Sequence, residues 1–344
     1  MEYINSHTIV NKNFFKKRKI IREILQKKYK IRENFSFFTL FSFNDTVVRN
    51  RKPINYLLTK HNLCAIIEQM SLNNSSALEL KNSGRLSVFF VGTGSAFSKR
   101  YFQTNVLVVK GDDHLLIDCG TLCPYALEKN YGLELKSIDN LLLTHPHADH
   151  IGGAEELALV GRYVKKQKCN LVITDEFKKL LWDESLKGGL KVNEEGALDI
   201  NDYFNQIKPE LLQSKPFELL ETNIGSINIK LFRTKHVTCE VTGDFQISYG
   251  VLLDDKVLFT SDTQFNLEQL EYLIQKYPVK VVFHDCDFSG YSESVHASYN
   301  QLKTLPDDIK KMTYLCHYNR LAEKFDVKAD GFRNLARAGV WYRC

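Results

Sequence analysis

The sequence predicts an α/β (α+β) fold in which short buried strands end in loops that carry histidines and aspartates. Residues 86–344 alternate β-rich apolar runs with helical segments, as in a mixed sheet-and-helix domain. Residues 141–143 are three leucines, and they lead directly into three histidines and one aspartate within residues 145–150. Seven of the ten histidines lie in this cluster or near a later strand-like run. Because loops at one edge of a sheet lie close together, we expect these side chains to form one site.

The chain also divides by charge into two parts, residues 1–85 and residues 86–344. The first contains 16 Lys and Arg against 6 Asp and Glu, and the second contains 30 against 35. We therefore expect a basic N-terminal module followed by a larger, mildly acidic domain. In residues 10–33 apolar side chains recur at helical spacing between basic ones, which predicts an amphipathic helix with a basic face. That face is either solvated, the interpretation we favour, or a contact surface for nucleic acid or another anionic partner.

Composition and patterning predict a cytoplasmic protein without a membrane anchor. Residues 1–11 lack the apolar core and small-residue cleavage site of a secretory signal. The most apolar runs, residues 35–43 and 86–91, are too short to span a bilayer. The eight cysteines form no CxxC pair, and several lie in apolar runs, as reduced core thiols of cytosolic proteins do.

From Leu86 onward the sequence predicts strands, tight turns and helices. Strands are expected at residues 86–91, 106–109, 114–118, 141–143, 170–174, 224–232, 245–253, 256–260, 279–283 and 312–316, and helices at residues 124–131, 154–160 and 176–186. The glycine-rich turn at residues 92–95 lacks the lysine of a P-loop and the spacing of a dinucleotide fingerprint, so it indicates only a turn. The polar stretch 187–198 has no periodicity, and we interpret it as a surface insertion rather than a loop over the site.

Metal binding is the chemistry that the cluster at residues 145–150 favours. Imidazole and carboxylate groups suit Zn²⁺, Mn²⁺ or Fe²⁺, and ligands this close in sequence let one loop contact two ions. A single loop histidine usually binds nothing, but four candidate ligands in six positions are hard to explain as chance. His236, Asp262, His284 and His317 each follow a predicted strand and extend the candidate set. Asp118, also at a strand end, is either a ligand or, as we favour, a hydrogen-bond partner of a ligating histidine.

These motifs resemble those of the metallo-β-lactamase superfamily. The resemblance covers about residues 86–344 and rests on a set of motifs in the family's order: His145-x-His147-x-Asp149-His150, then His236, then Thr260-Ser261-Asp262-Thr263, then His317. It implies an αββα sandwich with a dinuclear metal site along one edge. Residues 1–85 would then be an additional small basic module of unknown role, for which we find no resemblance.

Within the superfamily the chain is most similar to the ribonuclease Z-like phosphodiesterases. The similar segments are Phe90–Ser95 (opening strand and turn), Leu116–Gly120 (second motif), Phe283–Phe288 (their His-Glu-Ala-Thr-Phe segment, with Asp285 in place of Glu) and Val295–Ser298 (the segment of their catalytic histidine). The chain lacks the long Gly/Pro-rich arm that one tRNA-processing subgroup carries between the equivalents of His236 and Asp262. Small phosphodiesterases of this branch, including those that act on cyclic nucleotides, also lack that arm.

The resemblance also implies roles for single residues. One metal ion would bind His145, His147 and His236, the other would bind Asp149, His150 and His317, and Asp262 would bridge both. Two divalent ions, expected to be Zn²⁺ although Mn²⁺ or Fe²⁺ also fit, hold a bridging hydroxide in such sites. Asp149 would also orient or deprotonate this water. His296, which by itself would be interpreted as an exposed histidine at a helix start, would protonate the leaving group, with His284 or Asp285 holding its imidazole.

The function expected is metal-dependent hydrolysis of a phosphodiester, such as a cyclic nucleotide or a similar small diester. One alternative is a ribonuclease Z-like nuclease acting on RNA or DNA, to which the basic module would add affinity. Another is a non-catalytic regulator or scaffold on the same fold, which is disfavoured because no ligand position is missing. A thioester or lactone hydrolase is also possible, but it would need no proton donor at His296. The branch often dimerises, so a homodimer is a further expectation.

Overall fold

The computed structural model describes residues 78–239, 246–291 and 295–344, all of which belong to one compact unit. The amphipathic helix predicted at residues 10–33 and most of the basic module lie outside the described residues. Within the described ranges, no helix combines the length and apolar character needed to cross a bilayer.

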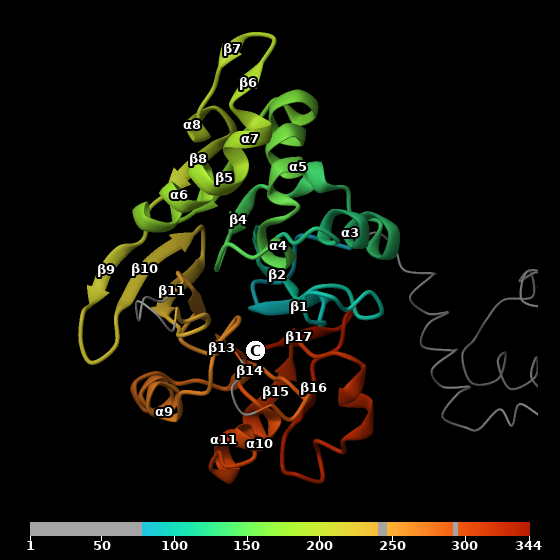
Figure 1. Ribbon diagram of the computed structural model, residues 1–344, viewed down its shortest axis with the longest axis vertical. Coiled ribbons are helices and arrows are strands. Elements are labelled where there is room, and N and C mark those ends of the chain that lie inside the picture. Colours follow the sequence, from blue (N-terminus) through green and yellow to red (C-terminus); the bar gives the residue numbers. More distant parts are fainter. Residues whose placement is uncertain (1–77, 240–245, 292–294) are drawn as a thin grey trace, which may run out of the picture. The chain divides into compact units, whose positions relative to one another are not determined.

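Two β-sheets lie at the centre of the unit (Figure 1). The first contains, in spatial order, β17 (Trp341–Arg343), β1 (Ser87–Gly92), β2 (Asn105–Lys110), β3 (Asp113–Ile117), β4 (Asn140–Leu142), β5 (Cys169–Val172) and β8 (Phe204–Ile207). The second contains β16 (Asn334–Leu335), β15 (Thr313–Cys316), β14 (Val281–Asp285), β13 (Val257–Phe259), β12 (Tyr249–Leu253), β11 (Ile227–Arg233), β10 (Leu219–Ile224) and β9 (Glu210–Gln213). A small separate hairpin joins β6 (Val192–Asn193) to β7 (Gly196–Ala197).

Helices cover the outer face of each sheet (Figure 1). The helices that alternate with strands of the first sheet along the chain are α3 (Cys123–Tyr131), α4 (Ala148–Ile151), α5 (Ala154–Leu159), α6 (Asp175–Leu181), α7 (Lys187–Leu190) and α8 (Ile200–Tyr203). The second is covered by α9 (Leu267–Lys276), α10 (Tyr299–Leu302) and α11 (Asp307–Met312). Shorter helical turns are η2 (Leu135–Ser137), η3 (Val160–Lys165), η4 (Trp182–Leu186) and η5 (Arg320–Lys324). The αββα order predicted from the sequence is confirmed.

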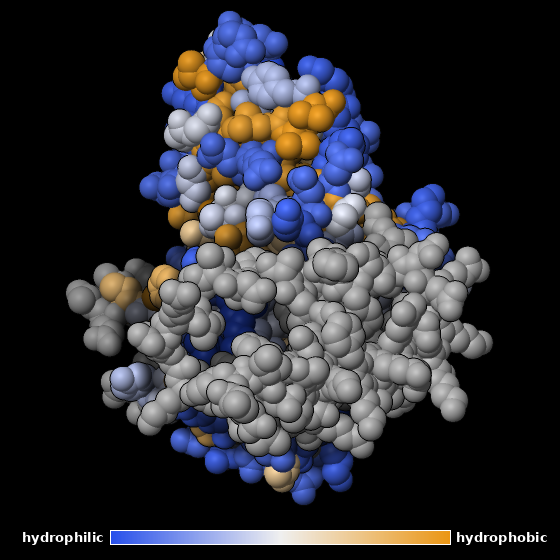
Figure 2. Space-filling view, turned by 90° about the vertical axis from the view of Figure 1, so that its right-hand side faces the viewer, coloured by the Kyte–Doolittle hydropathy of each residue, from blue (hydrophilic) through white to orange (hydrophobic). Residues whose placement is uncertain are grey.

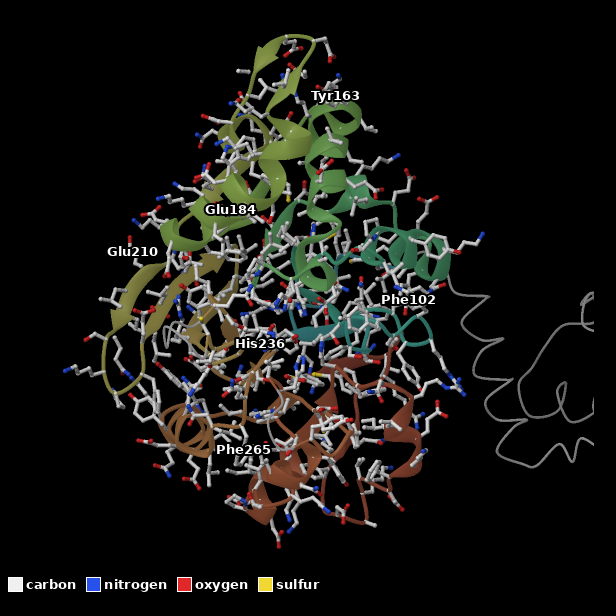
Figure 3. The ribbon with its side chains drawn as sticks, viewed as in Figure 1. Phe102, Tyr163, Glu184, Glu210, His236 and Phe265 are labelled. Atoms are coloured by element: carbon white, nitrogen blue, oxygen red, sulfur yellow. The ribbon has the colours of Figure 1, made fainter. Side chains whose placement is uncertain are left out.

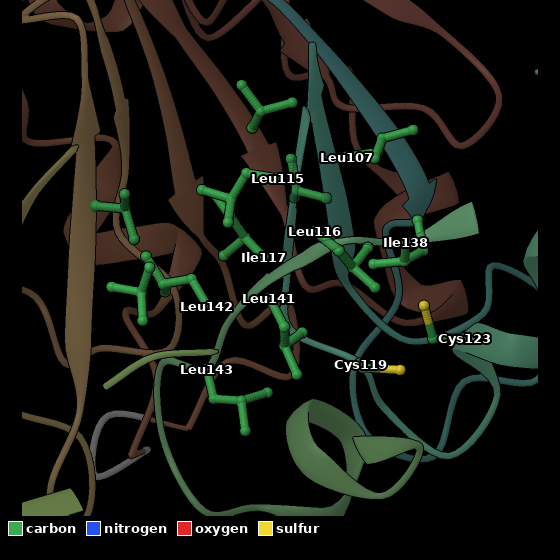
Figure 4. Packing of buried hydrophobic residues seen from close by; sticks show 14 of the residues in the cluster. Leu107, Leu115, Leu116, Ile117, Cys119, Cys123, Ile138, Leu141, Leu142 and Leu143 are labelled. Carbon is green, nitrogen blue, oxygen red and sulfur yellow. The ribbon is translucent and has the colours of Figure 1, made fainter. Parts of the chain in front are cut away.

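The core between the sheets fixes how the two layers face each other. Phe90 of β1 and Phe283 of β14 are fully buried, and their ring centroids lie 4.9 Å apart across the interface. Neighbouring Val282 faces the other way and packs with the helices behind the second sheet. Figure 4 shows the leucines of β3 and β4 packed on both faces of the first sheet, with Cys119 and Cys123 in the same buried cluster. Truncating a side chain such as Phe90 to alanine should cost about 3–5 kcal/mol of stability.

Parallel strands in each sheet bring together the loops that carry the candidate ligands. In the first sheet β3, β4 and β5 are parallel, and in the second β13, β14 and β15 are parallel. Parallel neighbours place their carboxyl ends at the same edge of a sheet. Three non-glycine residues at these ends adopt positive φ: Asp118 (62°), Ser261 (50°) and His317 (57°). Such conformations are uncommon for non-glycine residues and are held only where the surrounding structure enforces them.

The structure corrects the predicted elements in three places. The strand predicted at residues 224–232 begins only at Ile227, because Ile224 ends β10 and Gly225 at φ 52° turns the chain between β10 and β11. The helix predicted at residues 176–186 ends as an α-helix at Leu181 and continues as a π-helical turn. The stretch 187–198, interpreted as an aperiodic surface insertion, contains α7 and the β6–β7 hairpin, which are too short to show a period. Phe245, the predicted start of the strand at residues 245–253, lies outside the described residues.

An apolar surface lies over η3 and the β6–β7 hairpin. Tyr163, Val164 and Val192 are exposed there, and Figure 2 shows apolar side chains gathered at this end of the molecule. Figure 3 labels Tyr163 at this end and His236 in the central region. The stretch 187–198 therefore lies at the surface, apart from the strand ends that carry the candidate ligands.

Candidate metal centre

The seven residues predicted as metal ligands converge in two groups that share one aspartate. In the first group, one ligand atom from each of four residues lies within 4.8 Å of the others: His145, His147, His236 and Asp262. In the second group the same holds for Asp149, His150, Asp262 and His317. The loop after β4 and the helix α4 that follows it supply four of these residues, and strand ends of the second sheet supply the rest.

In the first group the imidazole nitrogens point at one another. His145 Nε2 lies 3.1 Å from His147 Nδ1, and His236 Nε2 lies 3.2 Å from the same atom. Burial, together with His150, holds the pKa of His145 well below its ordinary value, and burial also lowers the pKa of His147 and His236. The rings are therefore neutral, which is the form that binds a metal ion. Converging lone pairs repel unless a proton or a cation lies between them.

In the second group several buried polar atoms have no hydrogen-bond partner. Among the described residues these include Asp149 Oδ2, His150 Nε2 and Asp262 Oδ1. His150 Nε2 lies 3.3 Å from Asp149 Oδ2 and 3.4 Å from Asp262 Oδ2, and His317 Nε2 lies 3.2 Å from Asp262 Oδ2. Buried polar atoms are normally satisfied, so their convergence here is unusual. A divalent cation among imidazole nitrogens and carboxylate oxygens would satisfy them, so the residues fit such an ion.

In the second group, neighbouring charges shift the pKa values of His150 and Asp262 in opposite directions. Burial opposes a charge on His150, yet Asp262 and Asp118 raise its pKa well above the ordinary value. Burial likewise opposes ionisation of Asp262, yet His317 and His150 hold its pKa well below the usual range. Without a metal, a proton on His150 thus balances the buried carboxylates. Metal binding would displace that proton, since only a neutral imidazole can act as a ligand.

Further contacts fix the orientation of two imidazoles. His150 Nδ1 lies 2.7 Å from Asp118 Oδ2, and His236 Nδ1 lies 2.9 Å from the carbonyl oxygen of Val295. The backbone of His236 is held as well, because its carbonyl accepts a 2.7 Å hydrogen bond from Gln264 Nε2. In each ring one nitrogen is engaged outward, so the other faces the group of ligand atoms.

His296 lies at the edge of the same site. Its Nδ1 lies 2.7 Å from Asp285 Oδ2 and 3.9 Å from Asp262 Oδ2, and its side chain is 24% exposed. Burial lowers its pKa, but Asp285 and Asp262 outweigh burial and raise the value to about 9. Asp285 also accepts the backbone N–H of Thr263 at 3.0 Å. His296 is thus a partly exposed imidazolium at neutral pH.

The structure separates His284 from this arrangement. His284 and Asp285 are neighbours on β14, so their side chains face opposite sides of the sheet. His284 is buried, its Nδ1 contacts the carbonyl of Asp285, and it lines a small cavity with Gln269 and Leu273 beneath α9. Of the two residues predicted to hold His296, Asp285 makes the contact.

Sequence reasoning missed the contribution of Gly120. A Cβ atom at this position would lie 1.9 Å from the carbonyl oxygen of Asp149. The missing side chain lets the loop after β3 contact the turn that carries Asp149 and His150. Its N–H donates to Asn105 Oδ1 at 2.7 Å, which fixes the loop from the other side. No sequence periodicity marks such an approach, because it depends on which loops meet.

Comparisons with known proteins cover the same part of the chain. Residues 86–342 match the family described as "Anti-Pycsar protein Apyc1". The Anti-Pycsar protein Apyc1 of Paenibacillus xerothermodurans is 35% identical over 244 residues, which are 71% of this chain and 92% of the relative. The protein of the same name from Bacillus phage 010DV004 is 35% identical over 267 residues, which are 75% of this chain and 98% of the relative.

Solved structures show the fold. The metallo-β-lactamase fold protein YhfI from Bacillus subtilis is 15% identical, with a TM-score of 0.56, over 76% of this chain and 100% of its own. Yeast PDE1 is 12% identical, with a TM-score of 0.53, over 76% of this chain and 100% of its own. Human tRNase Z, short form, is 16% identical, with a TM-score of 0.52, over 74% of this chain and 98% of its own.

The fold that these structures share is the one that the motifs predicted, and the extent of the family match covers both groups of ligand atoms. The chain therefore belongs to the Anti-Pycsar protein Apyc1 family, within the metallo-β-lactamase fold, and is a metal-dependent hydrolase of the phosphodiesterase class.

Proposed function

We propose that the chain is a dinuclear phosphodiesterase that hydrolyses a cyclic nucleotide or a similar small diester by means of a metal-bridging hydroxide. The observation that carries the proposal is the position of Asp262, which belongs to both groups of converging ligand atoms. A carboxylate with oxygens near both groups is suited to bridge two ions. Such a pair supplies a hydroxide nucleophile and stabilises charge on the phosphoryl oxygens.

The proposed ligand sets follow the two groups. His145, His147, His236 and Asp262 would hold one ion, and Asp149, His150, Asp262 and His317 would hold the other, with Zn²⁺ the expected metal. Asp149 is additionally proposed to orient the attacking water, because its Oδ2 is buried in the site without a hydrogen-bond partner. A positioned carboxylate of this kind can accept a proton from the nucleophile.

His296 is the proposed general acid. Asp285 engages its Nδ1, and the imidazolium form carries its second proton on Nε2. The raised pKa, about 9, keeps the ring protonated at neutral pH. A ribose oxygen is a poor leaving group as an alkoxide, and protonation as the P–O bond breaks removes that difficulty. Positioned proton donors of this type contribute roughly 10²–10⁴-fold to rates.

Cyclic nucleotides are the proposed substrate class for two reasons. The Apyc1 family is a phosphodiesterase family that degrades cyclic nucleotides. In addition, only 25 residues separate His236 from Asp262 in the sequence, too few for a long arm that grips a folded RNA, and the described part of this segment forms β12 and β13. The nuclease alternative is favoured by a different observation, the 16 basic residues within residues 1–85. The scaffold alternative is not retained, because the chain is a hydrolase.

The decisive experiment is a substrate screen with the full-length chain. Metal-free protein is reloaded with Zn²⁺ or Mn²⁺ and assayed on cyclic mononucleotides, cyclic dinucleotides, short RNAs and bis-p-nitrophenyl phosphate. We expect turnover of a cyclic nucleotide with two bound ions per chain, and loss of turnover in Asp262→Ala. Turnover of RNA alone, with a steep salt dependence, would favour the nuclease. Inert protein with every metal would overturn both.

Further proposals concern the domains, the location and the oligomeric state of the chain. Residues 1–85 are proposed as a basic module that contacts an anionic partner, residues 86–344 as the hydrolase domain, and the chain as a cytoplasmic homodimer. A version that begins at Leu86 should keep small-diester turnover. RNA cleavage, if present, should weaken in that version, because residues 1–85 carry all of the excess positive charge and the remaining residues are net negative.

A further inference from the structure

Thr144 contacts both ligand-bearing parts of the structure through one hydroxyl group. The residue lies just after β4, precedes His145 and is fully buried. Its Oγ1 lies 3.0 and 2.9 Å from the two carboxylate oxygens of Asp118. The same atom lies 3.1 Å from His145 Nδ1 and 2.9 Å from Ser261 Oγ. Four polar contacts on one buried hydroxyl leave little freedom in how its proton and lone pairs are used.

The directions of these hydrogen bonds follow from what each partner can do. A hydroxyl has one proton and two lone pairs. Asp118 already accepts the N–H of Thr144 at 2.8 Å and faces His150 Nδ1 at 2.7 Å, so its carboxylate acts as an acceptor. Thr144 therefore donates its hydroxyl proton to Asp118. Its lone pairs are left to accept from His145 Nδ1–H and from the hydroxyl of Ser261.

This assignment decides the tautomer of His145. A neutral imidazole carries one proton, so a proton on Nδ1 leaves the Nε2 lone pair unprotonated. Nε2 is the atom that faces His147 Nδ1 at 3.1 Å within the first group of ligand atoms. Asp118 does the same for His150 through its Nδ1. One carboxylate and one hydroxyl thus orient a histidine in each group.

Ser261 connects the hydroxyl to the opposite sheet. It follows β13, adopts a positive φ of 50° and directly precedes Asp262. Its hydrogen bond to Thr144 therefore joins the loop after β4 in the first sheet to the loop after β13, which carries the shared Asp262. Across that link His145 Nε2 and Asp262 Oδ2 lie 3.7 Å apart.

We propose that Thr144 is a positioning residue of the metal centre: its hydroxyl holds His145 in the tautomer that can bind a cation and, through Ser261, holds Asp262 in register with that histidine. The inference rests on the ligand set given under the proposed function. It assigns to Thr144 and Ser261 a role beyond packing, because an alkyl group of the same shape would fill the space and lose both effects.

The test is a metal titration of the full-length, metal-free chain with Co²⁺ and with Zn²⁺. Thr144→Val keeps the shape and removes the hydroxyl, Thr144→Ser keeps the hydroxyl, and Ser261→Ala removes only the link to the second sheet. We expect Thr144→Val to weaken one of the two ions by about 10–100-fold, as loss of a ligand's hydrogen-bond partner does. Thr144→Ser should bind both ions with nearly the wild-type affinity, and Ser261→Ala should lie between.

Two further readouts separate positioning from general damage. ¹⁵N-histidine NMR of the zinc-loaded chain should show the Nδ1–H tautomer of His145 in wild type and a changed signal in Thr144→Val. The double variant Thr144→Val/Ser261→Ala should be no weaker than Thr144→Val alone, because both contacts use the same hydroxyl.

Wild-type affinity for both ions in Thr144→Val, with an unchanged His145 signal, would overturn the inference. If Thr144→Val does not fold, as judged by circular dichroism of the metal-free chain, the other two variants decide. Unchanged metal binding in Ser261→Ala, or binding in Thr144→Ser as weak as that of an unfolded control, would then overturn it. A wild-type chain that binds fewer than two ions would instead contradict the proposed function.

Discussion

The two regions that supply the candidate ligands differ in how the chain brings them together. Residues 145–150 supply four ligands from the loop after β4 and from α4, which follows it directly. His236, Asp262 and His317 come from three separate strand ends of the second sheet. The first region is therefore local, whereas the second exists only when the sheet forms. Each group of ligand atoms takes members from both regions, so neither region completes a metal site alone.

Removing the shared aspartate should have the largest effect, because Asp262 is the member of the second region that both groups use. Asp262→Ala should lower kcat/KM by about 1,000-fold or more, since several kcal/mol of transition-state stabilisation would be lost. Elemental analysis should show fewer than two ions per chain. The matched control is His147→Ala in the local region, which should lose one ion only. Two ions retained in Asp262→Ala would show that the aspartate does not bridge.

Replacing the proposed general acid should have the next largest effect. His296→Asn should reduce turnover of a cyclic nucleotide by roughly 10²–10⁴-fold. Turnover of bis-p-nitrophenyl phosphate should change much less, because p-nitrophenolate leaves without a proton. The comparison of the two substrates in one variant is its own control. An equal loss on both would assign His296 to binding or structure instead.

The contact between Gly120 and the local region can be tested by adding volume. In Gly120→Val the new side chain would collide with the carbonyl oxygen of Asp149, 1.9 Å from the Cβ position, and would displace that turn. We expect about 10–100-fold weaker metal binding, comparable to the loss of a ligand's supporting contact. Gly188, where a Cβ meets nothing within 4 Å, provides the control variant Gly188→Val.

The pH dependence of turnover should change with Asp285. The proton on His296 is present below its raised pKa and is lost as pH rises through that value, so activity should fall at high pH. Asp285 is the main group that raises this pKa against burial. In Asp285→Asn the fall in kcat should therefore move to lower pH. A fall at an unchanged pH would show that another group limits the reaction.

Metal removal, which should abolish turnover, should also lower stability, and this change in stability is the smallest of the expected effects. An ion that binds only the folded chain stabilises it by about 2.7 kcal/mol when its concentration is 100 times Kd. A chelator should therefore lower the melting temperature of wild type. The shift should shrink in His147→Ala and nearly vanish in Asp262→Ala. A melting temperature independent of chelator in wild type would argue against tight binding by either region.

The local region could be predicted from the sequence because its residues are neighbours. Four candidate ligands within six positions after a leucine triplet are visible without a fold, and the structure places their ligand atoms in the two groups. The three distant ligands were found from a weaker signal, a polar residue after each strand-like run, together with the family resemblance. His284 carries the same signal, yet the alternation of β14 turns it away from the site.

By itself, the sequence determined the alternation of strands and helices, the candidate ligand types and the family resemblance, because these depend on residue order and spacing. Tertiary structure alone decided which strand ends meet, that Asp262 belongs to both groups, that Asp285 rather than His284 contacts His296, and that Thr144 joins Asp118 to Ser261. The physical reason is that these contacts join residues far apart in the chain, and only the packing of two sheets brings them within hydrogen-bond distance.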